Sequence, residues 1–344
     1  MMEHFIKYVD IHNFKSIVDL RLEDCRRINL FIGYPNVGKS NALEALSLFS
    51  IPFLEKGENL NKLVRVENAV ELFHSSSEGN ICNIDTNLNR LELVLQPPYF
   101  QIFHGKDGIG GKGTVYSFVE DLKLFDKGPY SNSEDEELKF YDESNIKRYT
   151  FSLDNKWKSN NKSQLLPPFG ENIIDVLSYN QNVTDVLNFI KKEFEKSDLQ
   201  LVLNKKDKSI LVQRNVSKEV VLLLPYSSLA DTLQRVIFYK TAIASNKNSV
   251  LLFEEPETHA FPSYIANITQ DIIAAKTNQF FIVTHSPFVI NDFLEYEHLR
   301  RETSIYLFDF KNSRTIVKRL TDEAMDEVYD YGIDLFFNIE SFLE

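Results

Sequence analysis

Residues 27–41 read RINLFIGYPNVGKSN, and this stretch decides the fold of the 344-residue chain. A mostly apolar run over residues 28–32 predicts a buried strand, which leads directly into G-x-x-x-x-G-K-S at residues 33–40. Apolar residues then recur at helical spacing up to Phe49. Strand, glycine-rich loop and helix in this order predict a loop that wraps around a phosphate. Glycines allow the backbone to approach closely, and the loop N–H groups and the helix N-terminus then face the anion.

The loop predicts a site for ATP and Mg²⁺. In such a loop Lys39 reaches the β- and γ-phosphates, and the Ser40 hydroxyl binds the metal ion. The predicted nucleotide-binding residues of the loop are Gly33, Asn36, Val37, Gly38, Lys39, Ser40 and Asn41. A second glycine-rich stretch at residues 105–114 has Lys106 where the first glycine belongs and Gly113 after its lysine. We interpret that stretch as a hairpin loop.

Composition narrows the class of protein. With 43% hydrophobic residues and 27 Phe, the chain can bury a large core, and its two cysteines predict neither disulfides nor zinc. We expect a cytoplasmic protein, because no segment approaches the roughly 18 apolar residues of a membrane span and the N-terminus has no signal pattern. The net charge of -12 argues against a broad nucleic-acid surface. A lysine-rich stretch at residues 191–218 is interpreted mainly as a solvated surface, although a local nucleic-acid contact stays open.

The remaining sequence predicts alternating β and α/β regions. Two or three strands precede the glycine-rich loop, residues 69–130 read as a β-rich region, and residues 173–194 read as helix followed by a hairpin near residues 204–207. An acidic run at residues 134–137 is interpreted as an exposed insertion. Residues 250–284 then predict a strand, a helix begun by Pro262 and a second strand, which together form one βαβ unit.

Two strands of the second half end in groups that can act on a phosphate. The run VLLFEEPE at residues 250–257 places carboxylates at the carboxyl edge of a parallel sheet, where α/β proteins bind ligands. There Glu254 is expected to hold Mg²⁺, and Glu255 is expected to orient and deprotonate the attacking water. His285 ends the next predicted strand at the same edge, and we expect it to donate a hydrogen bond to the γ-phosphate.

Three motifs together resemble one family. Residues 33–40, the EEPETHAFP stretch at residues 254–262 and VTHSP at residues 283–287 resemble the Walker A, Walker B and H-loop motifs of ABC-type ATPases. Within that class they are similar to the OLD-like, RecF-related AAA ATPases found in bacterial anti-phage systems, as is NFKSI at residues 13–17. The resemblance implies an α/β P-loop NTPase fold of the ABC-ATPase type, with a mixed central sheet, flanking helices, a β-rich lobe and an inserted α/β lid. Segment boundaries are expected at 1–115, 116–220 and 221–344.

The family also implies a head-to-tail dimer that holds ATP between the P-loop of one subunit and the signature motif of the other. Residues 227–236 lie where that signature belongs, but Asp231 or Thr232 replaces its usual glycine. The resemblance implies that Ser228 and Arg235 contribute to nucleotide binding, and that hydrolysis is slow if the signature is atypical. An amphipathic core helix with a solvent-facing Arg235 is the alternative. Gln96 is a candidate for the Q-loop glutamine.

Several functions are compatible with these motifs. The first is an ATP-driven dimeric switch, or a higher homo-oligomer, that controls a separate effector such as a nuclease or toxin in anti-phage defence. The second is a RecF-like ATPase that repairs or clamps DNA. A transporter subunit is less compatible, because the chain has no Leu-Ser-Gly-Gly-Gln signature. The aromatic carboxy-terminal region from Asp326 onward is interpreted either as a docking element or as a capping core helix.

Overall fold

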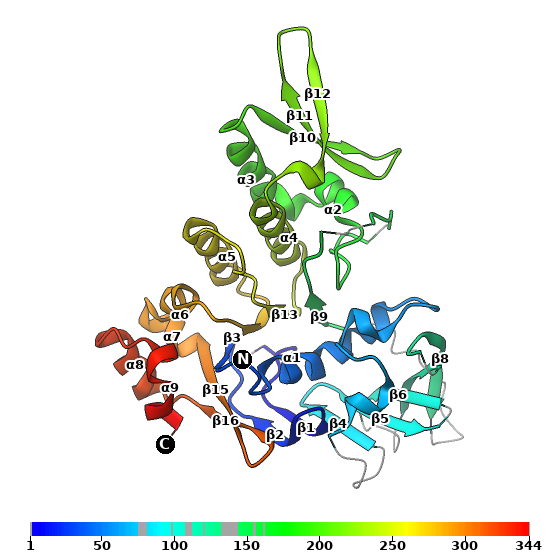
Figure 1. The fold of residues 1–344 in the computed structure, drawn as a ribbon, viewed down its shortest axis with the longest axis vertical. Helices are drawn as coiled ribbons and strands as arrows, with labels where there is room; N and C mark the ends of the chain where they lie inside the picture. Colours follow the sequence, from blue (N-terminus) through cyan, green and yellow to red (C-terminus); the bar gives the residue numbers. More distant parts are fainter. Residues whose placement is uncertain are drawn as a thin grey trace. The chain divides into compact units, whose positions relative to one another are not determined.

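The computed structural model describes residues 2–74, 81–97, 99–106, 112–119, 121–131, 144–153, 156–160 and 162–343. The chain divides into two compact units (Figure 1). The first contains residues 1–148, 248–255 and 279–344, and the second contains residues 149–247 and 256–278. The segment boundaries expected from the sequence, 1–115, 116–220 and 221–344, stay a prediction. The acidic run at residues 134–137 and residues 107–111 of the second glycine-rich stretch lie outside the described residues.

A six-stranded sheet forms the centre of the first unit, in the order β16-β15-β3-β14-β13-β9. Strand β3 pairs in parallel with β14 and β15, and β14 pairs in parallel with β13. Every residue of β3 and β14 is buried, which explains why these strands read as nearly continuous apolar runs. The strands are β3 (Ile28–Gly33), β9 (Ile146–Tyr149), β13 (Val250–Glu254), β14 (Gln279–Val283), β15 (Thr303–Lys311) and β16 (Arg314–Arg319).

Helix α1 (Lys39–Ser47) follows β3 and packs against β13 and β14, with Leu43 and Leu46 fully buried. After β14 the chain forms the short helices α6 (Pro287–Leu294) and α7 (Glu297–Glu302). Two more helices, α8 (Asp322–Asp330) and α9 (Leu335–Leu343), end the described chain, and α9 contacts β3 and β15.

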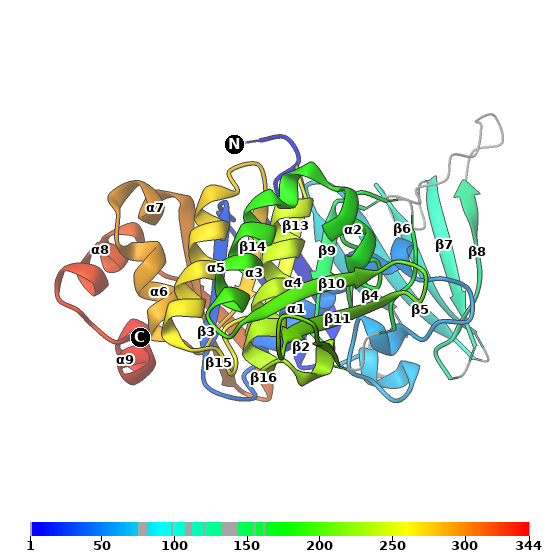
Figure 2. The ribbon, with the colours of Figure 1, turned by 90° about the horizontal axis from the view of Figure 1, so that it is seen from above.

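The amino-terminal strands and the predicted β-rich region join in one seven-stranded antiparallel sheet, ordered β2-β1-β4-β5-β6-β7-β8 (Figure 2). One buried core connects this sheet with α1 and the central sheet, because Ile11, Leu46, Leu93 and Phe281 belong to the same cluster. The prediction of β structure from residue 69 needs a small correction, since Ala69–Leu72 is a 3-10 helix. The strands are β1 (Val9–Phe14), β2 (Ile17–Leu22), β4 (Ile81–Thr86), β5 (Arg90–Gln96), β6 (Tyr99–Gly105), β7 (Lys112–Phe118) and β8 (Leu124–Ser131).

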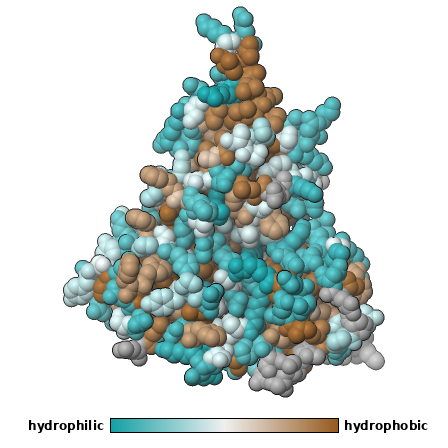
Figure 3. Space-filling model, viewed as in Figure 1, coloured by the Kyte–Doolittle hydropathy of each residue, from teal (hydrophilic) through white to brown (hydrophobic). Residues whose placement is uncertain are grey.

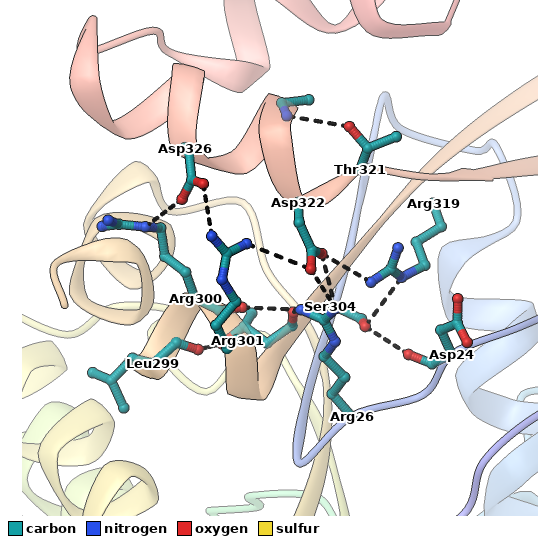
Figure 4. Close-up of polar contacts among 12 residues, drawn as sticks. Asp24, Arg26, Leu299, Arg300, Arg301, Ser304, Arg319, Thr321, Asp322 and Asp326 are labelled. Atoms are coloured by element: carbon teal, nitrogen blue, oxygen red, sulfur yellow. Dashed lines mark hydrogen bonds and ion pairs between the residues drawn. The ribbon is translucent and has the colours of Figure 1, made fainter. Parts of the chain in front are cut away.

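Arginines pair with aspartates of α8 and connect α7 and α8 to strands of the first unit (Figure 4). Arg26 precedes β3, and its Nη2 donates hydrogen bonds to both carboxylate oxygens of Asp322, each at 2.8 Å. Arg319 donates to the same carboxylate at 3.1 Å, while Arg300 and Arg301 bind Asp326 at 2.8 and 2.9 Å. These contacts therefore join α7, α8 and β16 to the start of β3.

The second unit combines helices with a small sheet. Helix α4 (Asp231–Ser245) packs against α2 (Ile173–Tyr179), α3 (Thr184–Glu195) and α5 (Pro262–Ala274). The three-stranded antiparallel sheet follows the order β10-β11-β12. Its strands are β10 (Leu199–Asn204), β11 (Ser209–Asn215) and β12 (Val221–Pro225). The predicted hairpin near residues 204–207 is confirmed by the pairing of β10 with β11.

Strand β12 lies at an edge of this sheet and is strongly apolar. Val221, Leu222 and Leu223 are each about half exposed, as is Val220 before them. Apolar residues gather over β10–β12 in the space-filling view (Figure 3). Within the described residues no helix is long and apolar enough to cross a bilayer.

Candidate functional site

The glycine-rich loop connects β3 to α1, as predicted. A Cβ at Gly33 would lie 2.5 Å from the carbonyl oxygen of Phe308 in β15, so only glycine fits beside that strand. Gly38 has φ +102°, which disfavours other residues, and a Cβ there would lie 2.1 Å from the Thr315 hydroxyl oxygen. Both glycines are therefore required by the path of the loop.

Lys39 is buried at the start of α1, with 4% of its surface exposed. Its Nζ donates hydrogen bonds to the carbonyl oxygens of Gly33 at 2.8 Å and Tyr34 at 2.7 Å. Burial lowers the pKa of Lys39 to about 8, although the nearby carboxylates of Glu255 and Glu254 oppose this shift. An anionic ligand in the loop would raise this pKa again, because a nearby negative charge favours an ammonium ion.

The loop lines a pocket of about 350 Å³. Two cationic side chains that the sequence did not predict as site residues also line it. These are Lys15, from the turn between β1 and β2, and Arg65, from the segment after α1. Both pair with the fully buried carboxylate of Glu44 in α1. The pocket is lined by Lys15, Asn36, Val37, Gly38, Lys39, Ser40, Asn41 and Arg65. Lys15 belongs to the NFKSI stretch, so the sequence held a signal for it, whereas nothing around Arg65 marked that residue.

Glu254 ends β13, where the sequence predicts a ligand for Mg²⁺. Both of its carboxylate oxygens are paired, Oε1 with Arg65 at 3.0 Å and Oε2 with Arg148 at 2.7 Å. The Arg65 side chain is 63% exposed, whereas that of Arg148 is only 6% exposed. The Glu254 carboxylate and the Ser40 hydroxyl are the oxygen donors that Mg²⁺ takes from P-loop proteins, with phosphates and water completing its shell. They fit the ion, provided that exposed Arg65 releases its oxygen.

Glu255 and His285 lie side by side at the carboxyl edge of the central sheet. Glu255 has φ +44°, and its N–H donates to the carbonyl of Val283 in β14 at 2.9 Å. Its Oε1 lies 3.6 Å from His285 Nε2, and both side chains are about 40% exposed. Burial and the charge of Lys39 lower the pKa of His285, whereas Glu255 raises it. The structure therefore brings Lys39, Glu255 and His285 together, while their catalytic roles stay predictions.

The predicted signature residues belong to the second unit. Tyr226–Ser228 forms a 3-10 turn, and α4 begins at Asp231. The Ser228 hydroxyl is exposed and donates to the carbonyl of Pro225 at 2.7 Å. The guanidinium of Arg235 lies over the ring of Phe151, 4.8 Å from its centroid, and its side chain is half-buried. The proposed nucleotide contacts of Ser228 and Arg235 stay predictions.

The Q-loop candidate Gln96 is exposed at the end of β5, where it pairs with Tyr99 of β6. This strand belongs to the antiparallel sheet. Its proposed role also stays a prediction.

Comparison with known proteins finds one matching family model and similar curated sequences. Residues 173–291 match the family described as "AAA domain, putative AbiEii toxin, Type IV TA system". The chain is 33% identical over 133 residues to the DNA replication and repair protein RecF of Caldanaerobacter subterraneus subsp. tengcongensis. It is 26% identical over 130 residues to RecF of Thermoanaerobacter sp. strain X514. Each match covers 36% of this chain, which spans about a third of the length of these curated relatives.

Solved structures of SMC heads share the fold. One, an SMC head with an extended coiled coil bound to the C-terminal domain of ScpA, derived from Pyrococcus furiosus, has a TM-score of 0.54 at 12% identity. That match covers 96% of this chain and 100% of the other. A second SMC head, bound to the C-winged helix domain of ScpA, has a TM-score of 0.51 at 14% identity, covering 93% and 99%.

The glycine-rich loop and the sheet around it have the arrangement of a P-loop protein, and these matches make the chain similar to ATPases of the AAA/ABC type. The predicted fold class is confirmed, since the structure combines the SMC head-like fold with a mixed central sheet, flanking helices and an antiparallel sheet. The chain is similar to RecF in sequence over about 130 residues and to SMC heads in fold.

Proposed function

We propose that this protein is an ATP-dependent switch whose nucleotide state controls its association with a separate effector protein. The observation that carries the proposal is the meeting of Lys39, Glu255 and His285 at one sheet edge, beside the metal-ligand candidate Glu254. A buried ammonium, a paired carboxylate and imidazole, and a phosphate-binding loop are the parts that phosphoryl transfer to water requires.

Each residue has a proposed task in hydrolysis. Lys39 binds the β- and γ-phosphates, and Glu255 orients a water molecule and accepts its proton. His285, 3.6 Å from Glu255, donates a hydrogen bond to the γ-phosphate. Bound Mg²⁺, held by Ser40 and Glu254, would neutralise phosphate charge. Because Arg65 and Arg148 already neutralise Glu254, metal binding must compete with Arg65 for one oxygen.

The switch is proposed to work as a homodimer or a higher homo-oligomer that encloses ATP between subunits. In this arrangement Ser228 and Arg235 of one copy complete the nucleotide site of another. The departure from the usual signature at Asp231 and Thr232 leads us to propose slow turnover. Slow hydrolysis suits a switch, because the ATP-bound state then persists long enough to hold a partner.

A protein partner is favoured over nucleic acid by the surface of the second unit. Strand β12 exposes apolar side chains rather than cations. In the lysine-rich stretch, Lys196 pairs with Glu193 at 2.7 Å and Lys191 with Glu195 at 3.9 Å, which reduces its positive charge. The match to a family described with a toxin supports a role in cellular conflict, and we propose anti-phage defence with a nuclease or toxin as the effector.

The second candidate function is a RecF-like ATPase that repairs or clamps DNA. The sequence similarity to RecF over about 130 residues favours it specifically. The net charge of -12 argues against it. Duplex binding relies on clustered Lys and Arg side chains that displace counterions from the DNA phosphates. ATP-dependent binding to duplex DNA with a steep salt dependence would establish this second function in place of the first.

The proposal is tested by the mass in solution of the Glu255→Gln variant with and without Mg-ATP. Glutamine cannot accept the proton from water, so this variant should retain ATP and assemble. The Lys39→Ala/Glu255→Gln double variant is the matched control, because it should bind no ATP and stay unassembled. A partner that co-purifies only with the assembled form would support the effector model. An assembly state that ignores ATP, or normal hydrolysis by Glu255→Gln, would contradict the model.

A further inference from the structure

The carboxy-terminal helix α9 contacts the strands that carry the nucleotide site. It packs against β3, which leads into the glycine-rich loop, and against β15. Leu335 and Ile339 anchor α9 because both are almost fully buried. The helix was expected to be either a docking element or a capping core helix, and these two residues agree with the second interpretation.

Phe336 of α9 lies against the imidazole of His285. The two ring centroids are 6.3 Å apart and the ring planes differ by 26°, which is within the range of stacked aromatic pairs. Glu255 lies 3.6 Å from Nε2 of the same imidazole. The His285 ring therefore has a carboxylate near one nitrogen and an aromatic ring against its face.

The backbone around Phe336 is held in place by its neighbour Asp334. The Phe336 N–H donates to Asp334 Oδ1 at 2.8 Å. Asn338 donates to the Asp334 carbonyl from both its N–H, at 3.1 Å, and its side-chain amide, at 2.8 Å. Because α9 is non-helical at Asn338, it is kinked there, and these bonds close its first turn. Phe336 thus belongs to a turn whose backbone is hydrogen-bonded to Asp334.

We propose that Phe336 is a positioning residue for His285, holding the imidazole in the orientation in which Nε2 faces Glu255 and the nucleotide site. The inference rests on the proposed function in one respect, since it assigns a consequence for ATP hydrolysis. Its physical basis is independent of that function: stacking restricts rotation of the ring about its side-chain bonds and removes one face from water.

The charged groups around the imidazole determine how the contact affects its protonation. Burial and the charge of Lys39 lower the pKa of His285, and Glu255 opposes that shift. Removing the Phe336 ring would expose the imidazole to water and leave the opposing charges in place. The pKa of His285 should then rise toward its ordinary value, and the ring should sample other orientations.

The test compares Phe336→Ala with Phe337→Ala. Phe337 is the next residue of α9 and is 87% exposed, so its removal controls for losing an aromatic side chain from this helix. Positioning effects of this kind can change rates tenfold or more. We expect Phe336→Ala to lower kcat about tenfold with little change in KM for ATP, while Phe337→Ala leaves both unchanged. Phe336→Tyr keeps a flat ring and should restore most of the activity.

A histidine NMR titration gives a readout that does not depend on activity. The His285 signal is identified by its loss in His285→Gln, and its pKa should rise in Phe336→Ala but not in Phe337→Ala. An unchanged pKa and kcat in a Phe336→Ala protein that still binds ATP would overturn the inference. If His285→Gln hydrolyses ATP normally, the catalytic role of His285 fails, whereas the NMR comparison still decides whether Phe336 positions the ring.

Discussion

Replacing Arg148 by Met should destabilise the first unit far more than replacing Arg65 by Met, although both arginines pair with Glu254. The Arg148 side chain is 6% exposed, and besides Glu254 it donates to the carbonyl of Leu63 at 2.6 Å. Arg65 binds the other oxygen of Glu254 and also pairs with Glu44, but its own side chain is 63% exposed and Glu44 keeps Lys15 as a second partner. The pair of variants therefore compares a buried and an exposed partner of one carboxylate.

The expected magnitudes follow from burial. Removing one partner of a buried ion pair destabilises a protein by about 3–5 kcal/mol, because the other charge stays away from water without its partner. An exposed pair contributes about 1 kcal/mol or less. For a unit of this size each kcal/mol shifts the melting temperature by about 2–4 °C. We expect a loss of about 6–20 °C for Arg148→Met and at most about 4 °C for Arg65→Met.

Thermal denaturation without nucleotide measures both variants, and a double variant separates charge from packing. In Arg148→Met/Glu254→Gln the carboxylate that has lost its buried partner is gone, so part of the lost stability should return. Equal shifts for the two single variants, or no recovery in the double variant, would refute the reasoning that the carboxylate of Glu254 depends mainly on Arg148.

Two further predictions concern the nucleotide site. Because the pKa of Lys39 is about 8 and a bound phosphate raises it, nucleotide affinity should stay constant below pH 7 and weaken about tenfold between pH 7 and pH 9, as calorimetry would measure. Lys39→Arg should remove this dependence, and a flat profile for the unsubstituted protein would contradict the assignment. Gly38→Ala should abolish nucleotide binding, because the new Cβ would collide with the Thr315 hydroxyl 2.1 Å away; circular dichroism of the folded variant and a binding titration check this expectation.

The parts of the fold that could be predicted are those encoded locally. The glycine-rich loop and the helix after it lie within one stretch of sequence, and so do β13, α5 and β14. The apolar periodicity of both stretches is strong. The boundaries came within a residue or two, as for β14, which ends at Val283 rather than at residue 284. The joining of β1 and β2 with β4–β8 in one sheet was not predicted, because strand pairing depends on contacts between distant segments.

The candidate site shows the same division between local and distant information. Lys39 and Glu255 were identified because each belongs to a motif with its own spacing. Arg148 lies 106 residues from Glu254, and no pattern near it indicates that it pairs with this carboxylate. The stacking of Phe336 on His285 likewise depends on how α9 returns to the sheet. Tertiary partners of motif residues therefore had to come from the structure.

The apolar edge strand β12 also limits how the chain can be handled and how it can vary. Val220–Leu224 is an uninterrupted run of large apolar residues at a sheet edge, the kind of segment that pairs with identical segments of neighbouring chains. Lys218 and Glu219 precede it and Pro225 ends it, where charged residues and proline interrupt such pairing. These flanking residues act as gatekeepers, and their replacement by apolar residues would lower the yield of soluble protein without changing the nucleotide site.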